Sequence, residues 1–109
     1  MKSWHDKLMD VRYSMSEEQK LKANKTISAL RRADRIQLNL DDYQTLFKIA
    51  EMIRDYPDND IPQEVRTANE NLEKRKTIRK TIYFMTGWMA RGAKWKKEKE
   101  VADVAKHAS

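Results

Sequence analysis

Helix-start signals recur along this chain, and they constrain its fold more than any other sequence feature. Ser3, Ser16, residues 41–42 and Asp60 each stand where a helix start favours a small polar or acidic side chain. Ser16 has a glutamine three positions later, which completes a capping box. Because the chain also holds only two glycines and two prolines, a turn-rich β architecture is disfavoured. We therefore expect an all-α fold, with residues 1–109 forming a single helical domain.

Apolar residues follow the first three starts at the spacing of one helix face. The members of these three stripes are Trp4, Leu8, Val11 and Met15; Leu21, Ala23, Ile27 and Leu30; and Tyr43, Leu46, Phe47, Ala50 and Ile53. Residues 36–40 separate the second stripe from the third and are expected to form a short extended link. The Tyr56–Pro57 step ends the third helix, because proline disfavours a helical residue before it. These features predict a small three-helix bundle within residues 1–60.

The fourth helix starts at Asp60, and no glycine or proline beyond its first turn interrupts it before Gly87. It carries two apolar sets, which are Ile61, Val65, Ala68 and Leu72, and then Ile78, Ile82, Met85 and Met89. At 100° per residue the two sets lie about 120° apart around a straight helix. Either the helix breaks, near 73–77 or 87–92, or its two halves face different surfaces. We expect one long basic amphipathic C-terminal helix whose distal half leaves the bundle.

The excess positive charge lies entirely in the second half of the chain. Residues 1–60 hold 11 Lys/Arg and 11 Asp/Glu, whereas residues 61–109 hold 12 and 6, which accounts for the net charge of +6. A basic amphipathic helix suits nucleic-acid phosphates, an anionic membrane surface or an acidic protein groove. A solvated helix face is the structural alternative for such a run of charge.

The cationic side of this helix is the predicted nucleic-acid-binding site. Its residues are Lys76, Arg79, Lys80, Tyr83, Arg91, Lys94 and Lys97. Lysine and arginine that neutralise phosphates release counterions, and Tyr83 is the candidate for stacking on an unpaired base. Arg31, Arg32 and Arg35 form a second basic cluster, which would extend the surface if the fold brings it beside the distal helix. The predicted function is a small accessory protein that contacts the phosphate backbone.

The apolar side of the same helix supports a different function. Phe84, Trp88, Met89 and Trp95 are candidates for a protein interface, although the aromatic residues among them also suit a core. In this alternative the chain is a modulator or inhibitor that inserts this helix into a larger nucleic-acid-processing enzyme. Interfacial membrane binding is a third, weaker hypothesis. The modest apolar content, 39% against 37% charged residues, also raises self-association as a source of stability.

The residues that usually carry catalysis or hold metals are scarce. There is no cysteine, and the two histidines stand near opposite ends of the chain. Asp55, Asp58 and Asp60 resemble the start of a calcium loop, but the required glycine and the acid at position twelve are missing. We interpret these residues as a turn and a helix cap. We therefore expect no enzymatic activity, no metal and no cofactor.

The longest uncharged segment near the basic region is residues 81–90, which rises only about 15 Å as a helix and is too short to span a membrane. The amino-terminal sequence has no apolar run of signal-peptide length. We expect a cytoplasmic location. The small size and lysine-rich end are also typical of accessory products of compact genomes, such as viral ones.

Overall fold

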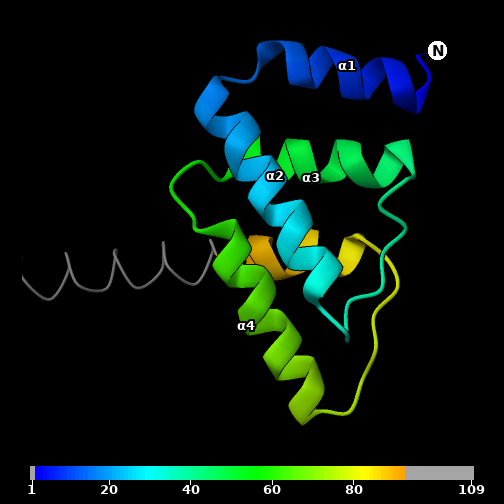
Figure 1. Ribbon diagram of the computed structural model, residues 1–109, viewed down its shortest axis with the longest axis vertical. Coiled ribbons are helices and arrows are strands. Elements are labelled where there is room, and N and C mark those ends of the chain that lie inside the picture. Colours follow the sequence, from blue (N-terminus) through cyan, green and yellow to red (C-terminus); the bar gives the residue numbers. More distant parts are fainter. Residues whose placement is uncertain (1, 93–109) are drawn as a thin grey trace, which may run out of the picture.

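The computed structural model describes residues 2–92, and within them the chain forms five helices (Figure 1). They are α1 (Trp4–Ser14), α2 (Glu17–Arg32), α3 (Tyr43–Asp55), α4 (Ile61–Lys74) and a fifth helix over residues 83–92, the last that the structure describes. The described part contains no strand, and its one β-type contact is an isolated parallel bridge between Ile36 and Arg79. The all-α prediction is confirmed.

Local capping accounts for the starts of the first four helices. The Ser3 and Ser16 side chains accept hydrogen bonds from the backbone N–H groups three residues later, and Ser16 forms the complete capping box with Gln19. Asp42 caps α3 by accepting from Gln44 N–H, two residues later, and Asp60 caps α4 by accepting from Gln63 N–H, with Pro62 in the first turn of α4. Each cap satisfies N–H groups that have no partner inside the helix. The four predicted starts are thus confirmed.

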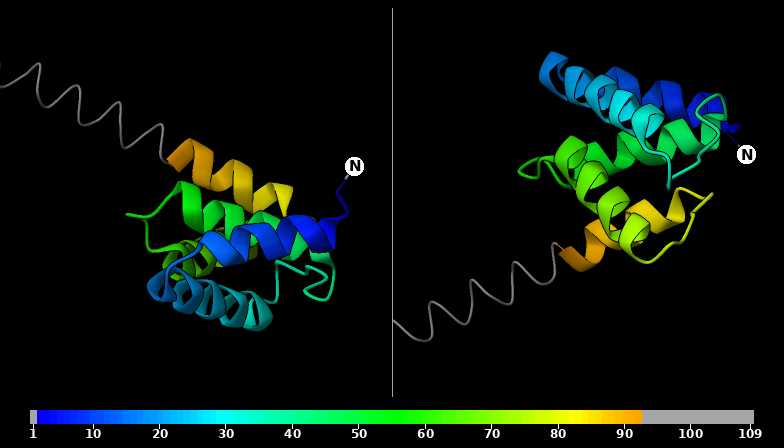
Figure 2. Two further views of the ribbon diagram at one scale, coloured as in Figure 1. Left: turned by 90° about the horizontal axis from the view of Figure 1, so that it is seen from above. Right: turned by 60° about the horizontal axis from the view of Figure 1, so that its bottom comes forward.

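Helix α3 lies at the centre of the arrangement. Helix α1 packs on α3, α2 packs on both α3 and α4, and the fifth helix lies against the green helices α3 and α4 in Figure 2. Two side-chain hydrogen bonds fix that last placement: Gln44 Nε2 of α3 donates to Tyr83 Oη, and Trp88 Nε1 donates to a Glu64 carboxylate oxygen of α4, each at 2.9 Å. The molecule is therefore not a three-helix bundle with an appended helix, because α4 and the fifth helix belong to the bundle.

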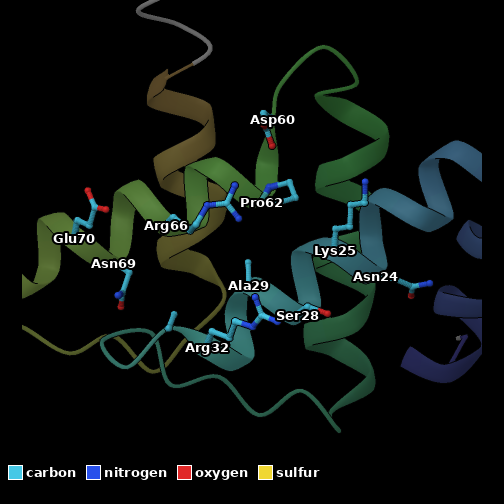
Figure 3. A pocket seen from close by; sticks show the side chains of 11 residues that line it. Asn24, Lys25, Ser28, Ala29, Arg32, Asp60, Pro62, Arg66, Asn69 and Glu70 are labelled. Atoms are coloured by element: carbon cyan, nitrogen blue, oxygen red, sulfur yellow. The ribbon is translucent and has the colours of Figure 1, made fainter.

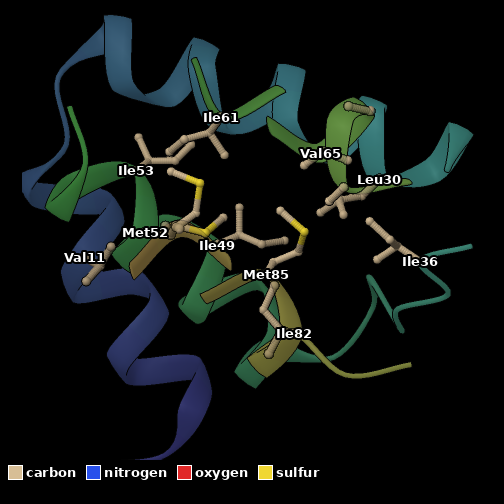
Figure 4. Packing of buried hydrophobic residues seen from close by; sticks show 14 of the residues in the cluster. Val11, Leu30, Ile36, Ile49, Met52, Ile53, Ile61, Val65, Ile82 and Met85 are labelled. Atoms are coloured by element: carbon tan, nitrogen blue, oxygen red, sulfur yellow. The ribbon is translucent and has the colours of Figure 1, made fainter. Parts of the chain in front are cut away.

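A single hydrophobic core joins all five helices. Ile82, Met85 and Met89 are fully or almost fully buried, and Figure 4 shows Met85 and Ile82 among side chains of the other elements, with Met85 beside Ile49. Ile36, from the link between α2 and α3, is also in the core at 1% exposure. The apolar set predicted for α4, from Ile61 to Leu72, is buried throughout.

The prediction of one long C-terminal helix is wrong, because residues 75–82 are not helical. Helix α4 ends at Lys74 with a Schellman motif, in which Thr77 N–H donates to Leu72 C=O and Lys76 N–H donates to Glu73 C=O. Lys76 occupies the left-handed region with φ of 54°, a position that usually holds glycine. That conformation costs about 1–2 kcal/mol. Burial of Ile82, Met85 and Met89 returns roughly 1.5–3 kcal/mol for each side chain, so folding back is favoured over extension.

Several positions predicted to face the core are exposed in the structure. Ile78, assigned to the second apolar set, lies in the connection and is 45% exposed. Leu21 of α2 and Tyr43 of α3 are also exposed, whereas Trp4, itself partly exposed, packs its ring 5.6 Å from that of Phe47. The break near residues 73–77 was one of the two sites considered from the sequence. At the other, residues 87–92 are helical.

Candidate nucleic-acid interface

The predicted nucleic-acid-binding residues do not share one helix face. Lys76, Arg79 and Lys80 lie in the connection 75–82, whereas Tyr83 and Arg91 lie on the fifth helix. Lys94 and Lys97 lie outside the described residues. The five described residues are exposed, so the connection and the helix that follows it present a cationic surface, although not as a continuous helix.

The connection 75–82 is attached at its centre to the link between α2 and α3. Arg79 N–H donates to Arg35 C=O at 2.9 Å, and Gln37 N–H donates to Arg79 C=O at 2.8 Å. Asn69 of α4 holds the same link, because its side-chain oxygen accepts from Arg35 N–H at 2.9 Å. These bonds give the connection a defined place beside the link between α2 and α3, even though it has no regular secondary structure.

The bridge places part of the second basic cluster beside this segment. Arg35 pairs with Arg79 through the backbone. Arg31 and Arg32 instead line two separate pockets on different sides of α2. Of the three arginines, only Arg35 therefore lies beside this segment, through its backbone, and the cluster as a whole does not extend the cationic surface.

A groove of about 840 Å³ runs between α4 and the segment 75–92. Three arginines, Arg75, Arg79 and Arg91, line it together with three aromatic residues, Tyr83, Phe84 and Trp88. Arg75 was not singled out in the sequence, since only its place in the fold turns it towards this groove. The groove therefore combines cations with aromatic rings, and its cations come from both the connection and the fifth helix.

Two of the three aromatic side chains of the groove, Phe84 and Trp88, lie in contact, and Arg79 lies beside Phe84. The Arg79 guanidinium carbon lies 5.7 Å from the centre of the Phe84 ring, within the range of a cation–π contact. The Phe84 and Trp88 ring centres are 6.0 Å apart and tilted by 50°. Both rings are half-buried and pack against the core, which leaves one side of each towards the groove. Tyr83 is the most exposed aromatic residue of the three, at 57%.

Negative charge is nearly absent from this region. Residues 74–92 contain six cations and no acid, the cations being Lys74, Arg75, Lys76, Arg79, Lys80 and Arg91. The one acidic residue that lines the groove is Glu64, whose carboxylate accepts the Trp88 hydrogen bond. In the part of the chain that the structure describes, every ion pair falls between residues 2 and 55. The positive potential of the groove is therefore not cancelled by neighbouring ion pairs.

The residues predicted for a protein interface are placed differently. Met89 is 1% exposed and belongs to the core, so it is not available for docking. Trp88 is half-buried and donates a hydrogen bond to Glu64, and Phe84 is half-buried beside it. Trp95 lies outside the described residues. The apolar side of the fifth helix thus packs inside this molecule, which the sequence could not distinguish from an external interface.

A second basic pocket lies between α2 and α4 (Figure 3). Lys25 and Arg32 of α2 line it with Arg66 of α4, a residue that the sequence analysis did not single out. Asp60 and Glu70 line the same pocket, and Arg66 donates two hydrogen bonds to the Gln63 side chain. This pocket is of mixed charge, and the groove beside the fifth helix is the more cationic of the two.

Residues 2–92 include no group of three histidine, cysteine or acidic side chains placed to hold a metal ion. No helix in this range is both long enough and apolar enough to cross a bilayer. Comparison with known proteins finds no match to a family model, to a curated protein or to a solved structure.

Proposed function

We propose that this chain is a small, non-enzymatic accessory protein that binds the phosphate backbone of nucleic acid. The binding surface is the groove between α4 and residues 75–92. One observation carries the proposal: six cations gather in a stretch with no acid, and three of them line a groove that also contains aromatic side chains.

The chemistry of the groove suits a single strand. Arginine binds phosphate oxygens through two parallel N–H donors, and each neutralised phosphate releases counterions into solution. The exposed Tyr83 ring offers a stacking surface for an unpaired base, a contact worth about 1–3 kcal/mol in comparable proteins. Backbone contacts of this kind bind without reading base sequence.

The alternative, a modulator that inserts its tryptophan- and methionine-containing helix into a larger enzyme, has less support. Insertion of Met89 would require its removal from the core, and insertion of Trp88 would break its bond to Glu64. The cationic groove needs no such rearrangement. A larger nucleic-acid-processing assembly as partner is compatible with the proposal, because this chain and that assembly would bind the same nucleic acid.

The test is fluorescence anisotropy of the full chain with labelled oligo(dT) and with a duplex, from 50 to 200 mM salt. If three to five cations contact phosphates, log K should fall against log salt with a slope of about −2 to −3.5 for the single strand. We expect the single strand to bind more tightly than the duplex. A salt-independent signal, or no binding at 50 mM salt, would contradict the proposal.

Two double variants with the same change in net charge distinguish binding at the groove from a non-specific effect of the protein's net charge. Arg79→Gln with Arg91→Gln removes two groove cations and should reduce the slope by roughly 1.4 and the affinity at 50 mM salt at least tenfold. Arg12→Gln with Arg31→Gln removes two cations that line a different cavity and should change the affinity less than threefold. Equal losses in the two variants would mean that the groove is not the binding surface.

A further inference from the structure

A second cavity, of about 230 Å³, lies among α1, α2 and α3, away from the basic groove. Helices α1 and α2 both pack on α3 but make few contacts with each other. Two alanines, Ala23 of α2 and Ala50 of α3, line the space between them. Small side chains at the meeting of three helices leave the volume unfilled, in contrast to the dense packing of an ordinary core.

Apolar side chains form most of the walls of this cavity, which Asn24 and three cationic residues also line. The side chains that form them with the two alanines are Leu8, Met15, Ile27, Leu40, Leu46 and Ile49. Leu8, Met15 and Ile49 are buried, whereas Ile27, Leu40 and Leu46 are partly exposed, so the cavity reaches into the core and is open to solvent. An apolar cavity of this type holds water poorly and accepts apolar ligands.

The mouth carries positive charge and no negative charge. Arg12, Lys20 and Arg31 line the cavity, and no carboxylate does. Lys20 lies 3.5 Å from Glu17, a residue that is almost fully exposed. Among residues 2–92, neither Arg12 nor Arg31 forms an ion pair. Both arginines therefore line the cavity without an ion-pair partner among the described residues, and their charge complements that of an anion.

We propose that this cavity binds a medium-chain carboxylate, with the alkyl chain inside and the carboxylate at Arg12 and Arg31. The volume sets the length of the chain. A cavity of about 150 Å³ accommodates benzene, with six carbon atoms, so 230 Å³ accommodates about eight to ten. Arginine favours the planar carboxylate because its guanidinium donates two parallel hydrogen bonds. Octanoate matches both the size and the charge.

This site is independent of the proposed nucleic-acid binding. The cavity and the groove have no lining residue in common. An oligonucleotide lacks the alkyl chain that would fill the cavity, and octanoate offers only one charge to the groove. Either proposal can therefore fail while the other stands.

The test is isothermal titration calorimetry of the full chain with octanoate below its micellar range. Octanol and octyltrimethylammonium, of equal chain length, serve as neutral and cationic comparators. We expect saturable one-to-one binding of octanoate, with octanol at least tenfold weaker and the ammonium compound without measurable binding. Equal binding of all three compounds, or no saturation by octanoate at 5 mM (an order-of-magnitude limit for a specific site), would overturn the proposal.

Variants then test the two halves of the site separately. Arg31→Gln should weaken octanoate binding about tenfold, and Arg31→Lys should weaken it by a smaller factor, because lysine keeps the positive charge but loses the paired N–H donors. Ala23→Leu fills the cavity and should weaken binding at least tenfold, whereas Ala90→Leu makes the same change at an exposed position outside the cavity and should not. Octanoate binding unchanged by both Arg31→Gln and Ala23→Leu would show that this cavity is not the site.

A direct measurement remains decisive if Ala23→Leu fails to fold. In the unaltered chain, the terminal methyl group of octanoate should show intermolecular nuclear Overhauser effects to the methyl groups of Leu46 and Ile49. Effects confined to residues of the fifth helix would overturn the assignment. Addition of oligo(dT) should leave these signals in place.

Discussion

At the scale of single residues, Lys76 combines an unfavourable backbone with an exposed cation. Its φ of 54° completes the Schellman motif that turns the chain back towards the core. Glycine would adopt this conformation without cost, yet a lysine stands here. Strained residues often persist where their side chain has a use. A role of the ammonium group in binding polyanions would account for lysine at this position.

Lys76→Gly is therefore expected to stabilise the fold while weakening nucleic-acid binding. The free energy gained by removing the left-handed strain exceeds the entropic cost of ordering a more flexible glycine. The free energy of unfolding should therefore rise by about 1 kcal/mol. Lys74→Gly is the matched control, because it removes the same charge from the last residue of α4 and should lower stability by about 0.5–1 kcal/mol. Urea denaturation measures both variants. Equal destabilisation by the two variants would contradict this account of the turn.

At the scale of elements, the sequence predicted what is decided locally. The starts of α1 to α4 follow from side chains that cap nearby N–H groups, and these contacts span only two or three residues. The end of α4 carries no such signal, because Lys76 is not a glycine and no proline follows. The helix stops there because burial of Ile82, Met85 and Met89 in the core stabilises the fold by more than the strained turn destabilises it. This stabilisation depends on tertiary packing, which cannot be predicted from the local sequence pattern.

The candidate site shows the same division between local and tertiary information. The positive charge of the segment and the residues Arg79, Tyr83 and Arg91 were identified from the sequence. The juxtaposition of Arg79 with Arg35 was not, since it depends on a bridge between two connections that are distant in the chain. Nor could the sequence tell that Met89 packs inward instead of meeting a partner.

The fifth helix carries Gly87, which lines the groove, and this glycine is not required by packing. A Cβ atom added at Gly87 would meet no atom within 4 Å, and its φ is not positive. Gly87→Ala should therefore raise the free energy of unfolding by about 0.5–1 kcal/mol through helix propensity and a less flexible unfolded chain. Ala90→Gly, at an exposed position of the same helix, should lower it by a similar amount. Thermal unfolding followed by circular dichroism measures both, and a loss of stability in Gly87→Ala would show that the open space has another constraint.

At the scale of the whole molecule, the second half of the chain completes the core of the first. The three buried residues of 82–89 together contribute about 5–9 kcal/mol of burial, comparable with the entire stability of a small domain. A bundle of the first three helices would lack this contribution. Folding is therefore expected to be cooperative across residues 2–92.

Truncation after Lys74 tests this dependence directly. The shortened chain should lose most of its helix content and its cooperative thermal transition, as followed by circular dichroism at 222 nm (the usual helix band). The full chain under the same conditions serves as the control. A sharp unfolding transition in the shortened chain would mean that α1 to α4 form a core of their own, as the bundle-and-tail arrangement expected from sequence requires.

The bridge between Ile36 and Arg79 has a consequence for how the groove meets a ligand. Connections between helices usually fluctuate, and a ligand that binds them must immobilise them, at about 1–2 kcal/mol for each residue ordered. Here backbone bonds that Arg79 makes with Arg35 and Gln37, and the bond that the Asn69 side chain accepts from Arg35 N–H, already restrain both connections. The backbone of Arg79 is thus preorganised. Binding of a polyanion there costs less conformational entropy than binding to an unrestrained basic segment would.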